Sequence, residues 1–139
     1  MGLEFKTDVS GDSQIIGASS IETITANKTI SLDDSGSIFL VGTDALTISL
    51  PATQKGATFT FINSGADGNN TITLSPVADD AIIGTIANAA ADSVASGVAD
   101  KDIVNTKATA NKGDRITIVG DGVDGWYIVE GVGIWASEA

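Results

Sequence analysis

Apolar and polar residues alternate in short segments along most of this chain. Residues 46–50 (Leu-Thr-Ile-Ser-Leu) and 71–75 (Thr-Ile-Thr-Leu-Ser) carry an apolar side chain at every second position. A period of two is typical of a strand with one buried face. Clusters of Gly, Asp, Asn and Pro separate such segments about every ten residues, a rhythm typical of a sandwich or barrel. We therefore predict an all-β fold, either a single-domain antiparallel β-sandwich or a jelly-roll-like barrel.

The expected strands share this alternation or a short run of apolar and β-branched residues. They lie around residues 21–32 and at 37–41, 46–50, 57–63, 71–75, 82–86, 115–119 and 126–129, with a weaker pair at 103–104 and 106–110.

Two stretches break the rhythm. Residues 1 to 20 have weak periodicity, and we interpret them as an N-terminal arm that is either disordered or docked on a neighbouring subunit. Residues 87–101 are rich in alanine, and they could form one or two helical turns ending at Gly97 or a loose surface insertion. The expected organisation is thus an arm over 1–20 and a β-sandwich domain over 21–139 with an insertion at about 87–101.

Four apolar residues outside the regular strands are candidates for an interface: Ile15 and Ile16 in the arm, and Ile134 and Trp135 near the C-terminus. Trp126, in the last hairpin, is expected to close the core. The Ile134-Trp135 pair is then either a final edge strand that covers this core or an anchor at a subunit or partner interface.

Composition limits the chemistry available to the chain. It contains no histidine and no cysteine, which removes Ser-His-Asp and Cys-His nucleophile systems, thiolate metal sites and disulfides. We therefore expect no enzymatic activity, no catalytic residues and no cofactor. No apolar run approaches the 18 or so residues that span a bilayer, so we expect no membrane partner.

Several acidic pairs and loops are candidates for metal or catalytic sites. Residues 121–125 (Asp-Gly-Val-Asp-Gly) resemble the start of a calcium loop, but the twelfth position is Val132 where an EF-hand needs a bidentate glutamate. We interpret this segment as a hairpin turn and predict no metal site. The pairs Asp33-Asp34 and Asp79-Asp80 lack the aromatic-lined cleft typical of glycosidases.

Charge argues against nucleic-acid binding. Eighteen acidic residues face seven basic ones, giving a formal net charge of −11. Such a chain is repelled by phosphates within a Debye length. The excess of acid either keeps the protein soluble or serves a cationic partner.

From residue 24 onward the order of strands and turns resembles the head decoration (cement) proteins of tailed bacteriophages. The resemblance is carried by residues 25–39, 46–52, 56–61 and 113–127, the last with the closing pattern Gly-Asp-Arg-Ile-Thr-Ile-Val…Asp-Gly…Gly-Trp-Tyr. It covers about residues 22–131 and fits poorly across 87–110. Similar strings also occur in phage tail and fibre modules.

The resemblance implies a structural virion protein, made in the host cytoplasm, that sits on the outer capsid surface. It implies a homotrimer that clamps subunits of the major capsid protein, with no cofactor or active site. The alternative is a receptor- or glycan-binding module of a phage tail fibre or adhesin. That alternative needs exposed aromatic residues, for which Trp126 and Trp135 are the tryptophan candidates.

Overall fold

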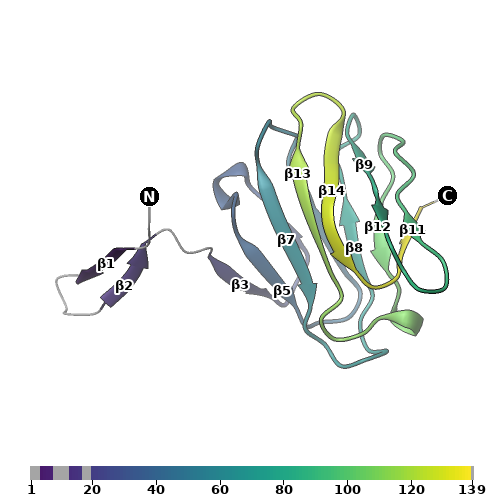
Figure 1. The fold of residues 1–139 in the computed structure, drawn as a ribbon, viewed down its shortest axis with the longest axis horizontal. Coiled ribbons are helices and arrows are strands. Elements are labelled where there is room, and N and C mark those ends of the chain that lie inside the picture. The colour runs from purple at the N-terminus through teal and green to yellow at the C-terminus, as the bar shows by residue number, and fades with distance from the viewer. Residues whose placement is uncertain (1–3, 8–12, 17–19, 139) are drawn as a thin grey trace.

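The computed structural model describes residues 4–7, 13–16 and 20–138 (Figure 1). Over these residues the regular elements are strands and two short 3-10 turns, with no α-helix. The strands are β1 (Glu4–Thr7), β2 (Ser13–Ile16), β3 (Ile21–Ile24), β4 (Lys28–Thr29), β5 (Ile38–Val41), β6 (Leu46–Ser49), β7 (Thr58–Asn63), β8 (Ile72–Ser75), β9 (Ala81–Ile83), β10 (Thr85–Ile86), β11 (Ser93–Val94), β12 (Ile103–Asn105), β13 (Arg115–Gly120), β14 (Gly125–Val132) and β15 (Trp135–Ser137), and the turns are η1 (Leu32–Asp34) and η2 (Lys107–Thr109).

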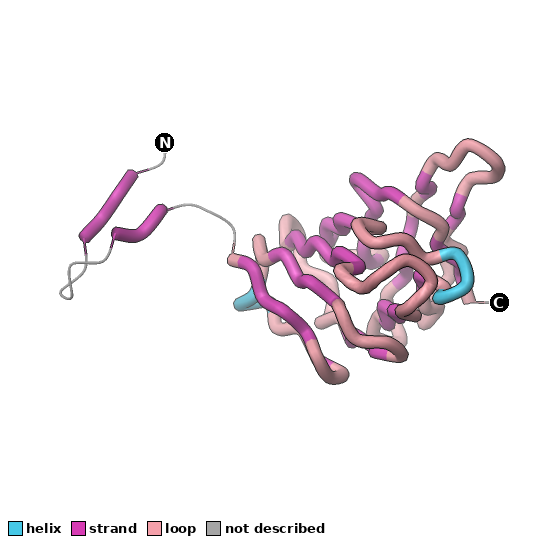
Figure 2. The backbone as a smooth tube through the Cα atoms, turned by 90° about the horizontal axis from the view of Figure 1, so that it is seen from below, coloured by secondary structure: helices cyan, strands magenta, loops and turns pink. Residues whose placement is uncertain are grey.

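Two sheets pack face to face, as the strand rhythm predicted. One has six strands in the order β3-β5-β7-β13-β14-β9, and the other has five in the order β15-β12-β8-β6-β4. The larger sheet lies at the front in Figure 1, and Figure 2 shows the two layers from below. Every second residue of the long strands points into the space between them, so Phe59 and Phe61 lie on one buried face. The largest side chains of this core are Phe39, Phe59, Phe61, Trp126, Ile30, Ile48, Leu50, Ile72, Leu74, Ile82, Ile86 and Ile103.

The first half of the sandwich is parallel, which corrects the antiparallel expectation. From β3 to β8 the chain crosses to the opposite sheet after every strand, so each strand pairs with the next but one. Parallel pairs therefore join β3 to β5, β5 to β7, β4 to β6 and β6 to β8. Alternation reports only which face is buried, and it is the same in parallel and antiparallel strands. The pairing direction was therefore hidden in the sequence.

The second half is mainly antiparallel. β13 lies between β7 and β14, and β12 lies between β8 and β15. β9 then adds a parallel edge to β14. That pairing requires glycine at position 125, where φ is +142° and a Cβ atom would collide with the backbone of Ala81.

The structure decides two local expectations. Of the two alternatives for the alanine-rich stretch, the helical turns do not form; β10 and β11 pair across it as a short antiparallel hairpin, with Thr85 opposite Val94. Alanine alone cannot hold a short helix in water without an apolar face to bury. Residues 106–110, expected as a weak strand, instead contain the 3-10 turn η2.

Candidate functional site

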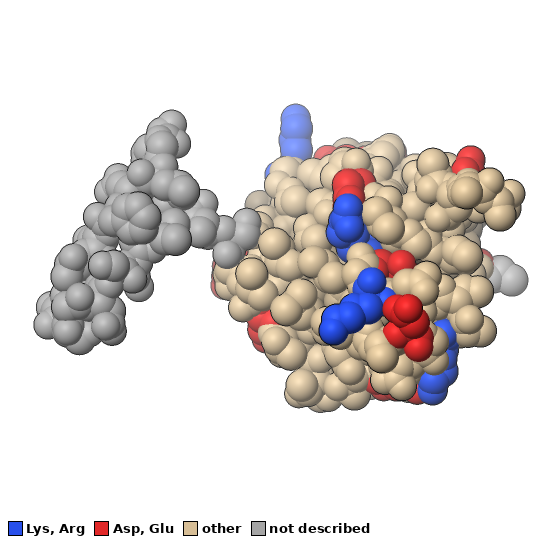
Figure 3. Space-filling model, turned by 60° about the horizontal axis from the view of Figure 1, so that its bottom comes forward, with Lys and Arg blue, Asp and Glu red and all other residues tan. Residues whose placement is uncertain are grey.

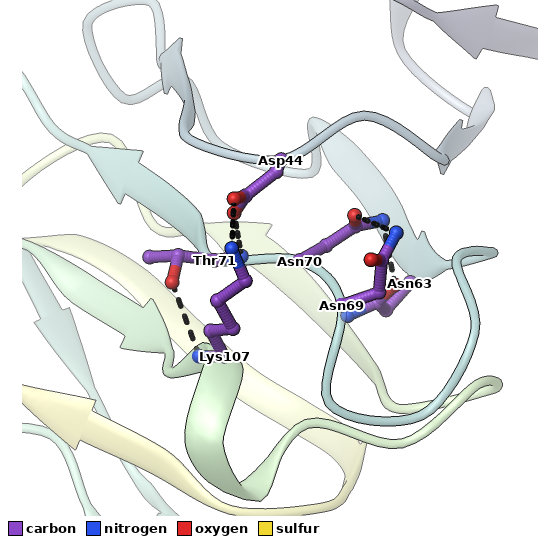
Figure 4. Close-up of polar contacts among 6 residues, drawn as sticks. All are labelled: Asp44, Asn63, Asn69, Asn70, Thr71 and Lys107. Atoms are coloured by element: carbon purple, nitrogen blue, oxygen red, sulfur yellow. Dashed lines mark hydrogen bonds and ion pairs between the residues drawn. The ribbon is translucent and has the colours of Figure 1, made fainter.

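A network of buried polar side chains crosses the core between the sheets. Asn63 on β7 donates its Nδ2 proton to Oδ1 of Asn105 on β12, over 2.8 Å. Asn105 donates in turn to Oδ2 of Asp114, over 3.0 Å. Oδ1 of Asn63 accepts from Gly65 N at 3.0 Å. It also accepts from Nδ2 of Asn70 at 3.4 Å (Figure 4). These four polar side chains are buried, and each has a partner.

The network is a structural link between the two sheets. Oδ2 of Asp114 also accepts from Asn111 N at 2.9 Å, and Nδ2 of Asn105 also donates to the carbonyl oxygen of Ile134 at 3.1 Å. A buried network with its donors and acceptors matched rigidifies a core. Its groups are engaged with one another and do not line an open site.

Asp44 fastens two loops beside this network. Its carboxylate accepts from Thr71 N at 2.8 Å and forms an ion pair with Nζ of Lys107 (Figure 4). Lys107 N also donates to Oγ1 of Thr71 at 3.1 Å. The hydrogen bond from Lys107, followed by that from the Thr71 N–H, lowers the pKa of Asp44 below its ordinary value. The arrangement ties the turn before β6 to the turn after β12.

The acidic segment at residues 121–125 is a hairpin turn, as expected. Oδ1 of Asp121 accepts three backbone N–H bonds, from Val123 and Asp124 at 2.8 Å and from Gly125 at 3.0 Å. These bonds hold the pKa of Asp121 below its ordinary value, that from Gly125 most strongly. The carboxylate thus holds the loop between β13 and β14.

The other acidic pairs also serve local structure. Asp34 caps η1 by accepting from Ser31 N at 3.1 Å. Asp80 is buried and accepts from Thr53 N at 2.7 Å. Across the described residues, no group of three or more Asp or Glu side chains is placed to hold a metal ion.

The two outer faces of the sandwich differ in chemistry. On the six-stranded sheet, residues that share a register row point to the same side. Outward rows run from Ile21 through Ile38 to Thr60, and from Leu40 through Ile62 to Arg115. We call this surface the aliphatic face; its members are Ile21, Ile38, Leu40, Ile62, Ile83, Val119, Tyr127 and Val132, with Thr58, Thr60, Thr117, Arg115 and Glu130 among them.

The opposite sheet presents mainly hydroxyl groups. Its register rows place Thr29, Ser49 and Ser75 side by side, and Thr47 beside Thr73. These positions alternate with the buried Ile48, Leu74 and Ile72 of the same strands. We call this surface the hydroxyl face.

Charged side chains are sparse on the aliphatic face. Arg115 and Glu130 form an ion pair there, with Nε and Oε1 2.8 Å apart. Figure 3, which looks toward the bottom of the molecule, shows several charged groups near the centre of the view and others at its edges, with uncharged surface between them. Most described carboxylates instead lie in the loops that join the strands.

The four interface candidates are divided by the structure. Trp135 lies on the edge strand β15, is 2% exposed and packs in the core. It therefore belongs to a final edge strand that covers the core and is not an exposed interface anchor. Its neighbour Ile134 is 47% exposed. Ile15 and Ile16 lie on β2, where they stand opposite Phe5 and Glu4 of β1 in an antiparallel pair. Trp126 is buried, as expected, so neither tryptophan offers a stacking surface.

A shallow groove of about 780 Å³ lies beside the C-terminal strand. It runs between residues 88–94 and 133–137, and its walls include Ala89, Ala91 and Ile134. Asn88, which could face a ligand, already donates to Ile86 O and Ser93 Oγ.

Sequence reasoning missed the aliphatic face. Its signal was present in residues 38–41 (Ile-Phe-Leu-Val), where the alternation is lost because both faces are apolar. Such runs are typical of strands covered on both sides. Residues 127–129 (Tyr-Ile-Val) carry the same signal.

Comparison with known proteins identifies no relative: no family model matches the chain, and no curated protein matches it. In the described part of the chain, no helix is long and apolar enough to cross a bilayer.

Proposed function

We propose that this chain is a structural protein of a bacteriophage virion, which decorates the outside of the capsid and stabilises contacts between capsid subunits. One observation carries the proposal beyond the resemblance of its strands and turns. The sandwich has an outer face rich in aliphatic side chains, on which Ile21 and Val132 are exposed and Ile38, Leu40 and Ile62 are half-buried. Large exposed apolar surfaces mark sites of protein association.

The polar groups support a scaffolding role. The buried network of Asn63, Asn105 and Asp114 bonds within itself, and Asp44 and Asp121 hold loops. The carboxylates best placed for chemistry thus serve the architecture. The net charge of −11 suits an outer surface, away from packaged nucleic acid.

The test uses purified phage heads with and without this chain. Heads that lack it should release their DNA at a lower temperature, and addition of the purified protein should restore the loss. Heads of unchanged heat resistance would overturn the proposal. Binding of the purified chain to host cells or to a glycan array would then favour the tail-fibre alternative.

A further inference from the structure

We infer that copies of this chain associate through the aliphatic face, with a second copy of the chain as its occupant. The inference deepens the proposed function and rests on its expectation that several copies act together. It adds the surface through which they meet.

The first argument comes from the side chains of β3, β5 and β7. Residues 38–41 on β5 are apolar on both faces of the strand, a pattern typical of strands covered on both sides. Their inner face is buried by the five-stranded sheet. On the outer face Ile21 remains 64% exposed and Val132 41% exposed. These positions have the chemistry of covered residues but no cover among the described residues.

The contrast between the two outer faces supports this reading. The hydroxyl face has Thr29, Ser49 and Thr73 where the aliphatic face has Ile38, Leu40 and Ile62. Hydroxyl side chains on β-strands are well suited to water. Exposure to water therefore accounts for the side chains of the hydroxyl face but not for those of the aliphatic face.

The charge distribution favours this face over the rest of the surface for contact with a second copy. A chain with a net charge of −11 repels its own copies wherever carboxylates would meet. The aliphatic face carries one ion pair, Arg115 with Glu130, and so is close to neutral. Two copies can therefore approach here without placing like charges against each other.

The area is sufficient for a specific contact. The sheet has six strands. Because neighbouring strands lie about 4.8 Å apart and are about 20 Å long, they form a face of about 500 Å². Two such faces bury about 1,000 Å², the lower limit for a specific interface.

The experiment measures the mass of the purified full chain by sedimentation equilibrium over a wide range of concentration. We expect a small multiple of 14.0 kDa, and we expect added salt to strengthen the association because it screens the acidic charge. Leu40→Glu should weaken association by about tenfold or more, because it places a charge in an apolar contact. The matched control, Thr73→Glu, adds the same charge to the hydroxyl face and should leave the mass unchanged.

Circular dichroism keeps the result interpretable. If Leu40→Glu fails to fold, Val132→Glu replaces it, since Val132 is more exposed and tolerates a polar side chain. A wild-type chain that stays at 14.0 kDa throughout, or a folded face variant that associates like wild type, would overturn the inference. The virion proposal is tested on heads instead, so either can fail without the other.

Discussion

The hydroxyl oxygens of Thr60 and Thr117 lie 2.9 Å apart on the aliphatic face, where the parallel half of the large sheet meets its antiparallel half. β7 is parallel to β5 on one side and antiparallel to β13 on the other. The hydrogen bond therefore links β7 to β13, the neighbouring strands at which the two halves of this sheet meet.

Replacing both threonines by valine tests how much this bond contributes. The free energy of unfolding of the double variant Thr60→Val/Thr117→Val should lie within about 1 kcal/mol of the wild-type value, because removing both partners together leaves no unpaired group. The extra apolar surface should also strengthen self-association in sedimentation. If urea denaturation shows that the free energy of unfolding falls by much more than about 1 kcal/mol, the hydroxyl pair holds the two halves of the sheet together.

The buried network should be sensitive to loss of its central member. Asn105→Ala leaves Asn63 Nδ2 without its acceptor in the core and removes one of the two hydrogen bonds that Asp114 Oδ2 accepts. We expect the free energy of unfolding to fall by about 2 to 4 kcal/mol in urea denaturation. Asn111→Ala is the control, because that residue is exposed and reaches Asp114 through its backbone N–H. Equal effects of the two variants would contradict a structural role for the network.

Substitutions of the two C-terminal candidates should differ in their effect on stability. Trp135→Ala should lower the free energy of unfolding by about 3 to 5 kcal/mol, since it opens a large cavity in the core. Ile134→Ala, next in the chain but exposed, should change the unfolding free energy by no more than about 0.5 kcal/mol. Thermal unfolding of both variants measures the difference, and a mild effect at Trp135 would show that it does not serve the core.

Acid should remove the contribution of Asp121. Since its folded pKa lies below the ordinary 3.8, the ionised carboxylate stabilises the fold above that value, and this stabilisation is lost as the pH falls through the folded pKa. Asp121→Asn keeps an acceptor oxygen but does not titrate. The stability advantage of wild type over this variant should therefore shrink between about pH 5 and pH 2. An advantage that stays constant over this range in urea denaturation would contradict the assignment.

The pKa of Asp44 should report its contact with Lys107. Lys107→Met removes the largest cause of the lowered pKa, so the pKa should rise toward 3.8. It should stay somewhat below that value, because the Thr71 N–H still donates to the carboxylate. Carboxyl NMR titration measures this change. Lys28→Met removes a lysine that pairs with Glu22 instead, and it should leave Asp44 unchanged.

Local pattern determined much of the fold. The alternation in residues 46–50 and 71–75 correctly predicted the strands β6 and β8 and their buried faces, because a period of two depends only on neighbouring residues. Turn chemistry likewise identified the loop at Asp121, since a short carboxylate can accept its own nearby N–H groups.

Tertiary structure alone decided how these pieces meet. The direction of pairing between β5 and β7 depends on how the chain crosses between the sheets, and no local pattern records it. Trp135 became a core residue because β12 lay free to receive β15. Ile38, Leu40 and Ile62 became one surface because strands distant in sequence were brought into register. The sequence by itself thus determined which side chains are apolar and where strands lie, while long-range pairing decided which of them are left uncovered.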